Sequence, residues 1–363
     1  MRLSAVIIFK MNLQLFKRFP VTAGTCLTAI AATLAWQSGG SIEWLTVDYH
    51  LWSGQIWRPL TATFPHVGWL HLIFNLYWVW LFGTRIEQVY GSARTAGLFV
   101  FLAAGSSLAE YDFGGQGVGL SGVGYGLFGF LWVLSHRDRR FWGVVDNQTV
   151  ALFLGWFVLC VVLTVRDIWH IGNVAHGAGL ILGLLAGWAV ARHYHVQARL
   201  LCGAVVAGIL VLLVVAGTVA RPYLNFTEYA GYEFGAQGCD ALKESRYADA
   251  VTDFQLALRR RGGWRTWYNL GIAYQESDQF EKAAEAYQQA FAIAGNEKDV
   301  KQALVSAKLC LARQAGDAGD DEKAARLCAQ VATIDPGNDE AREILRQHGR
   351  ARRKERDESR DPP

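Results

Sequence analysis

The segment GLSGVGYGLFGF, from Gly119 to Phe130, places a serine between glycines at the start of an apolar run. Small residues in such a run let two membrane helices pack closely, so a packing role alone would explain Ser121. A chemical role is the alternative, because a polar side chain in lipid usually faces a bundle interior or a water-filled cavity. The chain holds 38 glycines, so the motif cannot separate these two interpretations without its surroundings.

The composition divides the 363-residue chain into two parts. Apolar runs rich in Trp, Phe, Leu and Gly continue to about residue 219, and Lys, Arg, Asp, Glu, Gln and Ala dominate after it. The net charge is only +3 and no basic array interleaved with aromatic residues is present, so no nucleic-acid partner is expected. The predicted parts are an N-terminal segment at 1–19, a membrane domain at 20–219, a repeat domain at 230–340 and a disordered charged tail at 348–363.

Seven apolar runs are candidate membrane helices, since about 20 apolar residues span the hydrocarbon core. They lie at about 20–36, 67–84, 95–109, 120–135, 149–165, 173–191 and 201–219. The fold class predicted from them is all-α, a polytopic membrane helical bundle followed by a soluble helical-repeat domain. The first run follows Lys17 and Arg18 and also has features of a cleavable signal peptide, which remains the alternative for that run.

The basic residues predict an orientation, because cytoplasmic loops carry an excess of Lys and Arg. Most of the basic residues that flank the runs lie in every second connection: Lys10, Lys17 and Arg18; Arg85 and Arg94; Arg137, Arg139 and Arg140; Arg192 and Arg199. The other connections hold little beyond Arg58 and Arg166. We therefore expect a cytoplasmic N-terminus and, after seven spans, an external repeat domain. The expected setting is a bacterial inner membrane with the repeats in the periplasm.

Polar groups recur at one predicted depth of the bundle. His66, His71 and Asn75 begin the second run, Ser121 begins the fourth, and His176 lies near the start of the sixth. These three runs all travel from the outside inward in the predicted topology, so the polar groups should lie at a similar depth. His71 and Asn75 are four residues apart and share one helix face.

Glycines at helical spacing allow two of these runs to approach each other. Gly122 and Gly126 are four apart on the fourth run, and Gly179 and Gly183 repeat the spacing on the sixth. Faces of this kind bring helix backbones close together. We therefore expect the fourth and sixth runs to pack directly on each other.

That packing would bring the Ser121 hydroxyl within hydrogen-bonding reach of a ring nitrogen of His176. A serine hydroxyl is a weak nucleophile and needs such a base. His71 and Asn75 could donate hydrogen bonds to a developing oxyanion. Taken singly, His176 could instead be a hydrogen-bonded interior residue and Asn75 an interhelical contact; jointly these side chains favour a serine hydrolase in the membrane.

The residues and spacings closely resemble the rhomboid family of intramembrane serine proteases. The similarity extends in order over residues 57–188 and consists of five separated motifs. They are WR at Trp57 and Arg58; HVGWLHLIFN with His66, His71 and Asn75; Glu87 after FG; GLSGVGYG with Gly119, Ser121, Gly122 and Gly126; and AHGAGLILG with His176, Gly179 and Gly183.

The resemblance implies a six-helix membrane core plus one extra helix, and a Ser121–His176 dyad without an acidic third member. It implies that Tyr125 stacks on the histidine, and that Glu87 is structural. The oxyanion pocket that it implies is formed by Asn75, His71 and backbone N–H groups around Leu120 and Ser121. No metal ion or other cofactor is implied.

The family also implies a substrate class, namely membrane-anchored proteins cut in or beside a transmembrane helix. By the same resemblance, the loop at about 48–60 lies partly in the outer leaflet, and the fifth run and the loop around Trp169 form a lateral gate. The alternative function is a non-catalytic membrane scaffold that binds transmembrane helices and recruits partners. A channel or transporter is disfavoured, because the apolar runs hold few ionisable residues.

The second half of the chain resembles tetratricopeptide (TPR) repeats. Trp267, Leu270, Gly271 and Tyr274 have the W-x2-L-G-x2-Y spacing of that repeat. A unit 33 residues earlier places Phe234, Gly238, Ala250, Phe254 and Ala257 before Trp267, Gly271, Ala283, Tyr287 and Ala290. The third unit is carried by Ala324, Cys328 and Pro336, with residues 313–321 as an insertion in its turn.

The repeats predict a groove for a peptide or protein partner, and a stabilising or dimerising role is the alternative. In an oxidising compartment Cys310 and Cys328 could form a disulfide across the third repeat, leaving Cys239 free.

Overall fold

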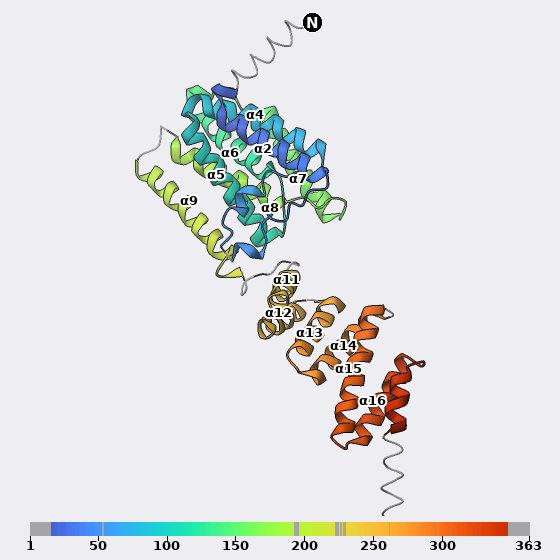
Figure 1. The fold of residues 1–363 in the computed structure, drawn as a ribbon. Coiled ribbons are helices and arrows are strands. Elements are labelled where there is room, and N and C mark those ends of the chain that lie inside the picture. The colour runs from blue at the N-terminus through green and yellow to red at the C-terminus, as the bar shows by residue number, and fades with distance from the viewer. Residues whose placement is uncertain are drawn as a thin grey trace, which may run out of the picture. The chain divides into compact units, whose positions relative to one another are not determined.

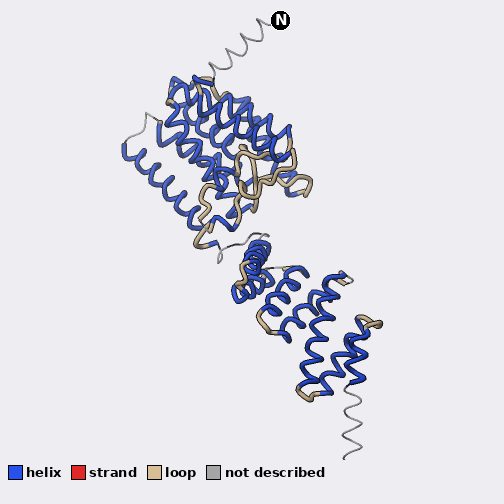
Figure 2. The backbone as a smooth tube through the Cα atoms, in the orientation of Figure 1, coloured by secondary structure: helices blue, strands red, loops and turns tan. Residues whose placement is uncertain are grey.

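The computed structural model describes residues 16–52, 54–191, 196–221, 225, 227, 230–260, 262–295 and 297–347. Helices are the only regular elements in these residues (Figures 1 and 2). The chain divides into two compact units, Met1–Thr227 and Glu228–Pro363. The predicted tail at 348–363 and most of the predicted segment at 1–19 lie outside the described residues.

Each of the seven predicted runs forms a helix in the first unit. They are α2 (Pro20–Gln37), α4 (Trp69–Tyr90), α5 (Ser92–Ala109), α6 (Ser121–Arg137), α7 (Asn147–Val165), α8 (Asn173–Val190) and α9 (Val196–Gly217). Within the described residues, four segments are long and apolar enough to cross a membrane, namely Ser92–Gly114, Asn147–Val165, Asn173–Val190 and Leu200–Gly217. The all-α fold class, a membrane bundle followed by helical repeats, is confirmed.

Helix α6 lies at the centre of the bundle and packs against α4, α5 and α8 (Figure 1). Almost every side chain from Gly122 to Leu134 is buried. Helix α7, in contrast, buries only Phe153 and Cys160 and turns large apolar side chains such as Leu159 outward. An apolar face of this kind suits contact with lipid.

The contact between α6 and α8 is built on glycines, as predicted. A Cβ atom at Gly179 or Gly183 would overlap the carbonyl oxygen of Gly122 or Gly126, respectively. The two backbones therefore touch directly at these positions, and no side chain could fit between them. This contact sets the separation of the two helices that carry Ser121 and His176.

Glu87 on α4 holds the first turn of α2. Its carboxylate accepts hydrogen bonds from the N–H groups of Val21 and Thr22 at 3.0 and 2.9 Å, and from the hydroxyls of Thr22 and Ser92 at 2.8 Å each. The first N–H groups of a helix have no partner within the helix, and a carboxylate there is favoured by the helix dipole. Both oxygens of the buried Glu87 carboxylate therefore accept hydrogen bonds.

Arg58 organises the loop between α2 and α4, which contains the short helices η1 (Tyr49–Leu51) and α3 (Arg58–Thr61). The guanidinium is buried and donates to the carbonyl oxygens of Glu43 and Thr46 at 2.7 and 2.6 Å, and to Asp48 Oδ2 at 2.9 Å. The neighbouring Trp57 is 47% exposed, so the two residues of the WR motif play different structural roles.

The extra helix α9 is attached to this loop at its C-terminal end. Trp52 Nε1 donates to the carbonyl oxygen of Gly217 at 3.1 Å. Just beyond α9, the buried Arg221 stacks over the Tyr111 ring at 3.9 Å and donates to the carbonyl oxygen of Asp112 at 3.1 Å.

Within the described residues, the second unit contains three helix pairs, each packed on the next, followed by helical residues at 339–347 (Figure 1). The pairs are α11 (Ala230–Lys243) with α12 (Tyr247–Arg259), α13 (Trp264–Glu276) with α14 (Phe280–Ala294), and α15 (Lys298–Asp317) with α16 (Asp321–Ile334). The 33-residue period is visible in the packing: a Cβ at Gly238 would lie 2.7 Å from the Phe254 ring, and one at Gly271 would lie 2.5 Å from the Tyr287 ring.

One expectation for the third pair was wrong. Residues 313–321 were predicted to be an inserted turn, but α15 continues through Asp317 and leaves only a short turn before α16. The reason is that α15 is 20 residues long against 13 in α13, and keeps burying apolar residues as far as Ala315. The disulfide that Cys310 and Cys328 could form in an oxidising compartment is not present in this structure: both cysteines are free, and Cys328 is enclosed among apolar side chains of the last helices.

Candidate active site

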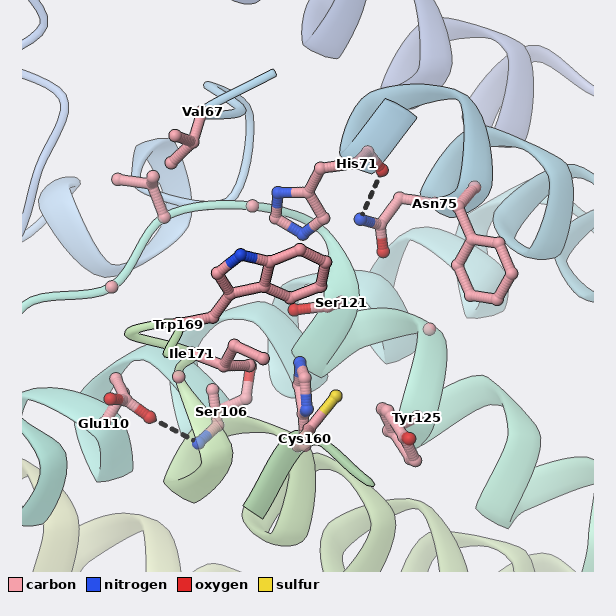
Figure 3. A pocket seen from close by; sticks show the side chains of 18 of the residues that line it. Val67, His71, Asn75, Ser106, Glu110, Ser121, Tyr125, Cys160, Trp169 and Ile171 are labelled. Carbon is pink, nitrogen blue, oxygen red and sulfur yellow. Dashed lines mark hydrogen bonds between the residues drawn. The ribbon is translucent and has the colours of Figure 1, made fainter. Parts of the chain in front are cut away.

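A cavity of about 840 Å³ opens within the first unit and brings the predicted polar side chains together. Its wall includes His71, Asn75, Ser121, Tyr125 and His176. In Figure 3 the side chains of His71, Asn75 and Trp169 lie around Ser121. The residues come from α4, α6, α8 and the loop before α8, so the bundle as a whole forms the site.

Ser121 is the first residue of α6, and its helix starts without a side-chain cap. The amides of the first turn of a helix have no intrahelical partner and carry its positive dipole end. Gly119, two residues earlier, has φ +118, which a side-chain-bearing residue rarely adopts, and a Cβ there would lie 2.9 Å from His71 Cε1. The glycine thus allows the sharp entry into α6 and the close approach of His71.

His176 is buried in the first turns of α8 and stacks on Tyr125, with ring centroids 4.8 Å apart and an angle of 25°. Its Nδ1 is enclosed and has no hydrogen-bond partner in the described residues. The Nε2 atom is therefore the nitrogen open to the cavity. Ser121 and His176 line one cavity but do not form a hydrogen bond in this structure.

His66 supports the site from behind rather than lining it. Its Nε2 accepts a hydrogen bond from the Leu120 N–H at 3.2 Å, and its Nδ1 lies 2.9 Å from the carbonyl oxygen of Phe64. An acceptor at Nε2 and a donor at Nδ1 define one neutral tautomer. The ring also meets His71 edge-on at 4.9 Å, so His66 connects α6 to the start of α4.

The Leu120 N–H, which was predicted to donate to an oxyanion, thus already donates to His66 Nε2. The remaining predicted donors are the Ser121 N–H, His71 and Asn75. Asn75 is buried on α4 and uses one N–H of its side-chain amide to donate to the carbonyl oxygen of His71 at 2.8 Å (Figure 3). A primary amide has a second N–H, which is the group that could serve a ligand in the cavity.

Sequence reasoning missed Glu110, which also lines this cavity. It lies in η2, a π-helical turn at Glu110–Gly114, immediately after the third predicted apolar run. Its side chain is 6% exposed, and its Oε2 accepts a hydrogen bond from the Ala175 N–H at 2.7 Å (Figure 3). The available signal was the position itself, because a carboxylate next to a membrane run is expensive to bury unless it has a partner.

No group of three or more His, Cys, Asp or Glu side chains among the described residues is arranged to hold a metal ion. The polar groups that line the cavity include the hydroxyl of Ser121 at the start of α6, the imidazoles of His71 and His176, and the amide of Asn75.

Comparisons with known proteins match both halves of the chain. A family model described as Rhomboid domain matches residues 53–193, and one described as Tetratricopeptide repeat matches residues 264–297. Rhomboid protease GlpG of Haemophilus influenzae is 30% identical over 141 residues, which are 39% of this chain and 72% of that protein. The chain belongs to the rhomboid family.

Other proteins named Rhomboid protease GlpG are similar over shorter shares of their length. That of Enterobacter sp. is 30% identical over 166 residues, 44% of this chain and 54% of that protein. That of Serratia proteamaculans is 37% identical over 142 residues, 38% of this chain and 50% of that protein. The chain therefore spans about half the length of these relatives.

Membership of this family and the apolar helices together make the chain a multi-pass integral membrane protein with a TPR region. The rhomboid match ends at residue 193, before α9, so the seventh helix lies outside the shared domain.

Proposed function

We propose that this rhomboid is an intramembrane serine endopeptidase that cleaves membrane-anchored proteins in or near a transmembrane helix. Ser121 is the nucleophile and His176 the general base. The observation that carries the proposal is the stacking of His176 on Tyr125 in the cavity that holds Ser121, with only the Nε2 edge of the imidazole open. The names of the relatives support the same activity.

The proposed reaction uses the groups around the cavity in order. Ser121 Oγ attacks the scissile carbonyl carbon while its proton moves to His176 Nε2. The negative charge on the carbonyl oxygen is stabilised by the Asn75 amide, His71 and the Ser121 N–H. His176 then gives its proton to the leaving amine, and water hydrolyses the acyl-enzyme with the same histidine as base. The Ser–His hydrogen bond, which the resting site lacks, forms when substrate closes the cavity.

The decisive experiment is covalent labelling of the detergent-solubilised full chain with a fluorescent fluorophosphonate. We expect wild type to label and Ser121→Ala and His176→Ala to remain unlabelled while their melting temperatures stay close to wild type. Ser107→Ala is the matched control, because Ser107 lines the same cavity and should label normally. Normal labelling of Ser121→Ala would refute the mechanism.

Asn75→Ala tests the oxyanion pocket separately. Loss of one preorganised donor of this kind slows catalysis about 10²-fold. The same loss is expected in the rate of fluorophosphonate labelling, with an unchanged extent at long times. An unchanged rate would remove Asn75 from the proposed pocket.

The alternative function, a non-catalytic scaffold, predicts that no form is labelled although all are folded. Transmembrane segments would then still be captured by the wild-type chain. The complete set of Ser121, His176, Asn75 and Tyr125 in one cavity favours the enzyme.

The proposed setting is a bacterial inner membrane, with the N-terminus in the cytoplasm and the repeats in the periplasm. Fusion of a periplasm-dependent phosphatase after residue 347 should give an active reporter, and an inactive one would reverse the topology. The repeat domain is proposed to bind a peptide or protein partner in its groove, as helix-pair arrays commonly do.

A further inference from the structure

Glu110 is a buried carboxylate whose function the proposed mechanism leaves open. It is 6% exposed, lies in a cavity wall and belongs to a π-helical turn, an element that is frequent at functional sites. A buried charge is retained at low energy only where hydrogen bonds compensate it.

The partner of Glu110 is the first turn of α8. Its Oε2 accepts the N–H of Ala175, the third residue of that helix, at 2.7 Å across 65 positions of sequence. Helix α8 begins at Asn173, and its N-cap residue Gly172 provides no side-chain cap. Glu110 therefore supplies, from the end of α5, the cap and the negative charge that a helix start favours.

Ala175 is the residue through which this contact reaches the site. Its N–H is held by Glu110, and its carbonyl oxygen lies 3.2 Å from where a Cβ at Gly122 would be. Gly122 follows Ser121, and His176 follows Ala175. One peptide segment thus lies between the carboxylate on one side and the nucleophile's helix on the other.

From this geometry we infer that Glu110 is a positioning residue for the proposed protease: it holds the first turn of α8, and with it His176, against the helix of Ser121. The inference rests on the proposed function. It assigns Glu110 no contact with substrate and no proton transfer.

The surroundings of Glu110 show that its side chain is held in one place. A Cβ at Gly114 would overlap Glu110 Oε1, one at Gly117 would lie 2.9 Å from Glu110 Cγ, and one at Gly172 would lie 3.3 Å from its Cδ. Three glycines thus make room for the carboxylate. Gly114→Ala should displace the carboxylate without adding an atom to α8, which makes it an independent variant.

Glu87 provides a matched control within the same unit. It is also a buried carboxylate that accepts N–H groups at a helix start, but the helix is α2 and Glu87 does not line the cavity. Glu87→Ala and Glu110→Ala each remove one long-range cap. Only the second should alter the site.

The test combines labelling kinetics with hydrogen–deuterium exchange on the full chain in detergent. We expect Glu110→Ala to lower the maximal rate of fluorophosphonate labelling about 10²-fold with an unchanged half-saturating probe concentration, as for a small misplacement of a catalytic group. Glu110→Gln keeps an acceptor and should remain within about fivefold of wild type. Gly114→Ala should behave like Glu110→Ala, and Glu87→Ala should label at the wild-type rate at temperatures below its unfolding.

Hydrogen exchange separates the inference from the proposed function. Glu110→Ala should speed exchange at the amides of Ala175 and His176 and leave the start of α2 unchanged, and Glu87→Ala should do the reverse. Wild-type labelling by Glu110→Ala would overturn the inference while leaving the proposed function intact. If no form is labelled, the proposed function fails, and the loss of protection at Ala175 alone would still support the positioning contact; unchanged protection there would overturn it.

Discussion

The membrane unit and the repeat unit both pack helices on glycines, but their glycines meet different groups. Gly179 and Gly183 place the backbone of α8 against backbone carbonyls of α6. Gly238 and Gly271 instead make room for the rings of Phe254 and Tyr287. The glycines of the membrane unit bring two main chains into contact, and those of the repeat unit make space for an aromatic side chain of the paired helix.

The polar groups of the two units also differ, in their burial and in their partners. The membrane unit encloses Glu87, Arg58 and Glu110, and each makes at least one hydrogen bond to a segment distant in sequence. Most ion pairs of the repeat unit lie at the surface, such as that of Arg326 with Glu322, whose side chains are 65% and 73% exposed.

The difference follows from the solvent. Lipid tails are as apolar as a leucine side chain, so membrane helices associate through close packing and internal hydrogen bonds. In water, burial of Tyr287 and its neighbours drives association of the repeats by the hydrophobic effect. Glycines and buried charges should therefore matter more for stability in the first unit than in the second.

The largest contrast is expected between Gly183→Ala and Gly271→Ala. The first introduces a methyl group onto the carbonyl of Gly126, where only a backbone shift can relieve the overlap. We expect it to destabilise the membrane unit by at least about 3 kcal/mol and to lower the labelling rate. The second meets the Tyr287 ring and should destabilise the repeats by only about 1 kcal/mol, because alanine also favours the helix. Thermal unfolding in detergent measures both losses of stability. Equal losses would contradict the proposed difference between the two units.

A smaller effect is expected from the buried carboxylate of α4. Glu87→Ala leaves the N–H groups of Val21 and Thr22 without their acceptor and should destabilise the membrane unit by about 2–3 kcal/mol. Glu87→Gln should recover part of the loss, since one acceptor remains. Thermal unfolding of both variants in detergent gives the difference. No change in either variant would show that this internal hydrogen bonding is dispensable.

Asp253, on α12, provides a partly buried carboxyl group in the repeat unit for comparison with Glu87 in the membrane unit. Burial and the neighbouring Asp249 raise the pKa of Asp253 to about 6, while Arg246 opposes the shift. Because the folded-state pKa exceeds the unfolded value, the contribution of this group to stability is most favourable at acidic pH. It is lost as pH rises from about 4 to about 6.

Asp253→Asn should therefore stabilise the repeats at pH 7 by about 1 kcal/mol, a value reduced for the partial exposure of the side chain. The variant and wild type should have similar stability near pH 4. Calorimetry of the full chain at pH 4.5 and 7 measures the two differences. A stabilisation that is independent of pH would contradict the assignment to this carboxyl group.

The smallest effect is expected at the surface of α16. Glu322→Ala breaks an exposed pair with Arg326 that has i,i+4 spacing and should change stability by less than about 0.5 kcal/mol. Unfolding of this variant beside Glu87→Ala, in the same detergent, compares an exposed charge with a buried one. A loss as large as that of Glu87→Ala would show that surface charge stabilises the repeats.

Much of the fold could be predicted because its signals are local. Every apolar run became a helix, since apolar length and composition are properties of the segment itself. The equivalence of Gly238 and Gly271 was readable from the 33-residue period. Where prediction failed, the signal was not local: α15 continues beyond its expected end because apolar residues up to Ala315 are buried by neighbouring helices.

For the candidate site, the sequence predicted that His71, Asn75, Ser121, Tyr125 and His176 lie together, and three of the five motifs carry these cavity side chains. It could not predict that the Leu120 amide donates to His66, since the two groups are 54 residues apart and meet only in the folded bundle. The sequence also did not indicate the role of Glu110, because the third predicted apolar run ends one residue before it.

The sequence by itself therefore determined the seven apolar runs that form helices, the two kinds of solvent that the two units face, and the identity of most polar groups in the membrane. The tertiary structure alone decided which carboxylate holds which helix start: Glu87 that of α2, and Glu110 that of α8. The physical reason is that hydrophobic periodicity is written in neighbouring residues, whereas a hydrogen bond across 65 positions depends on an approach that only the packed backbones of the bundle create.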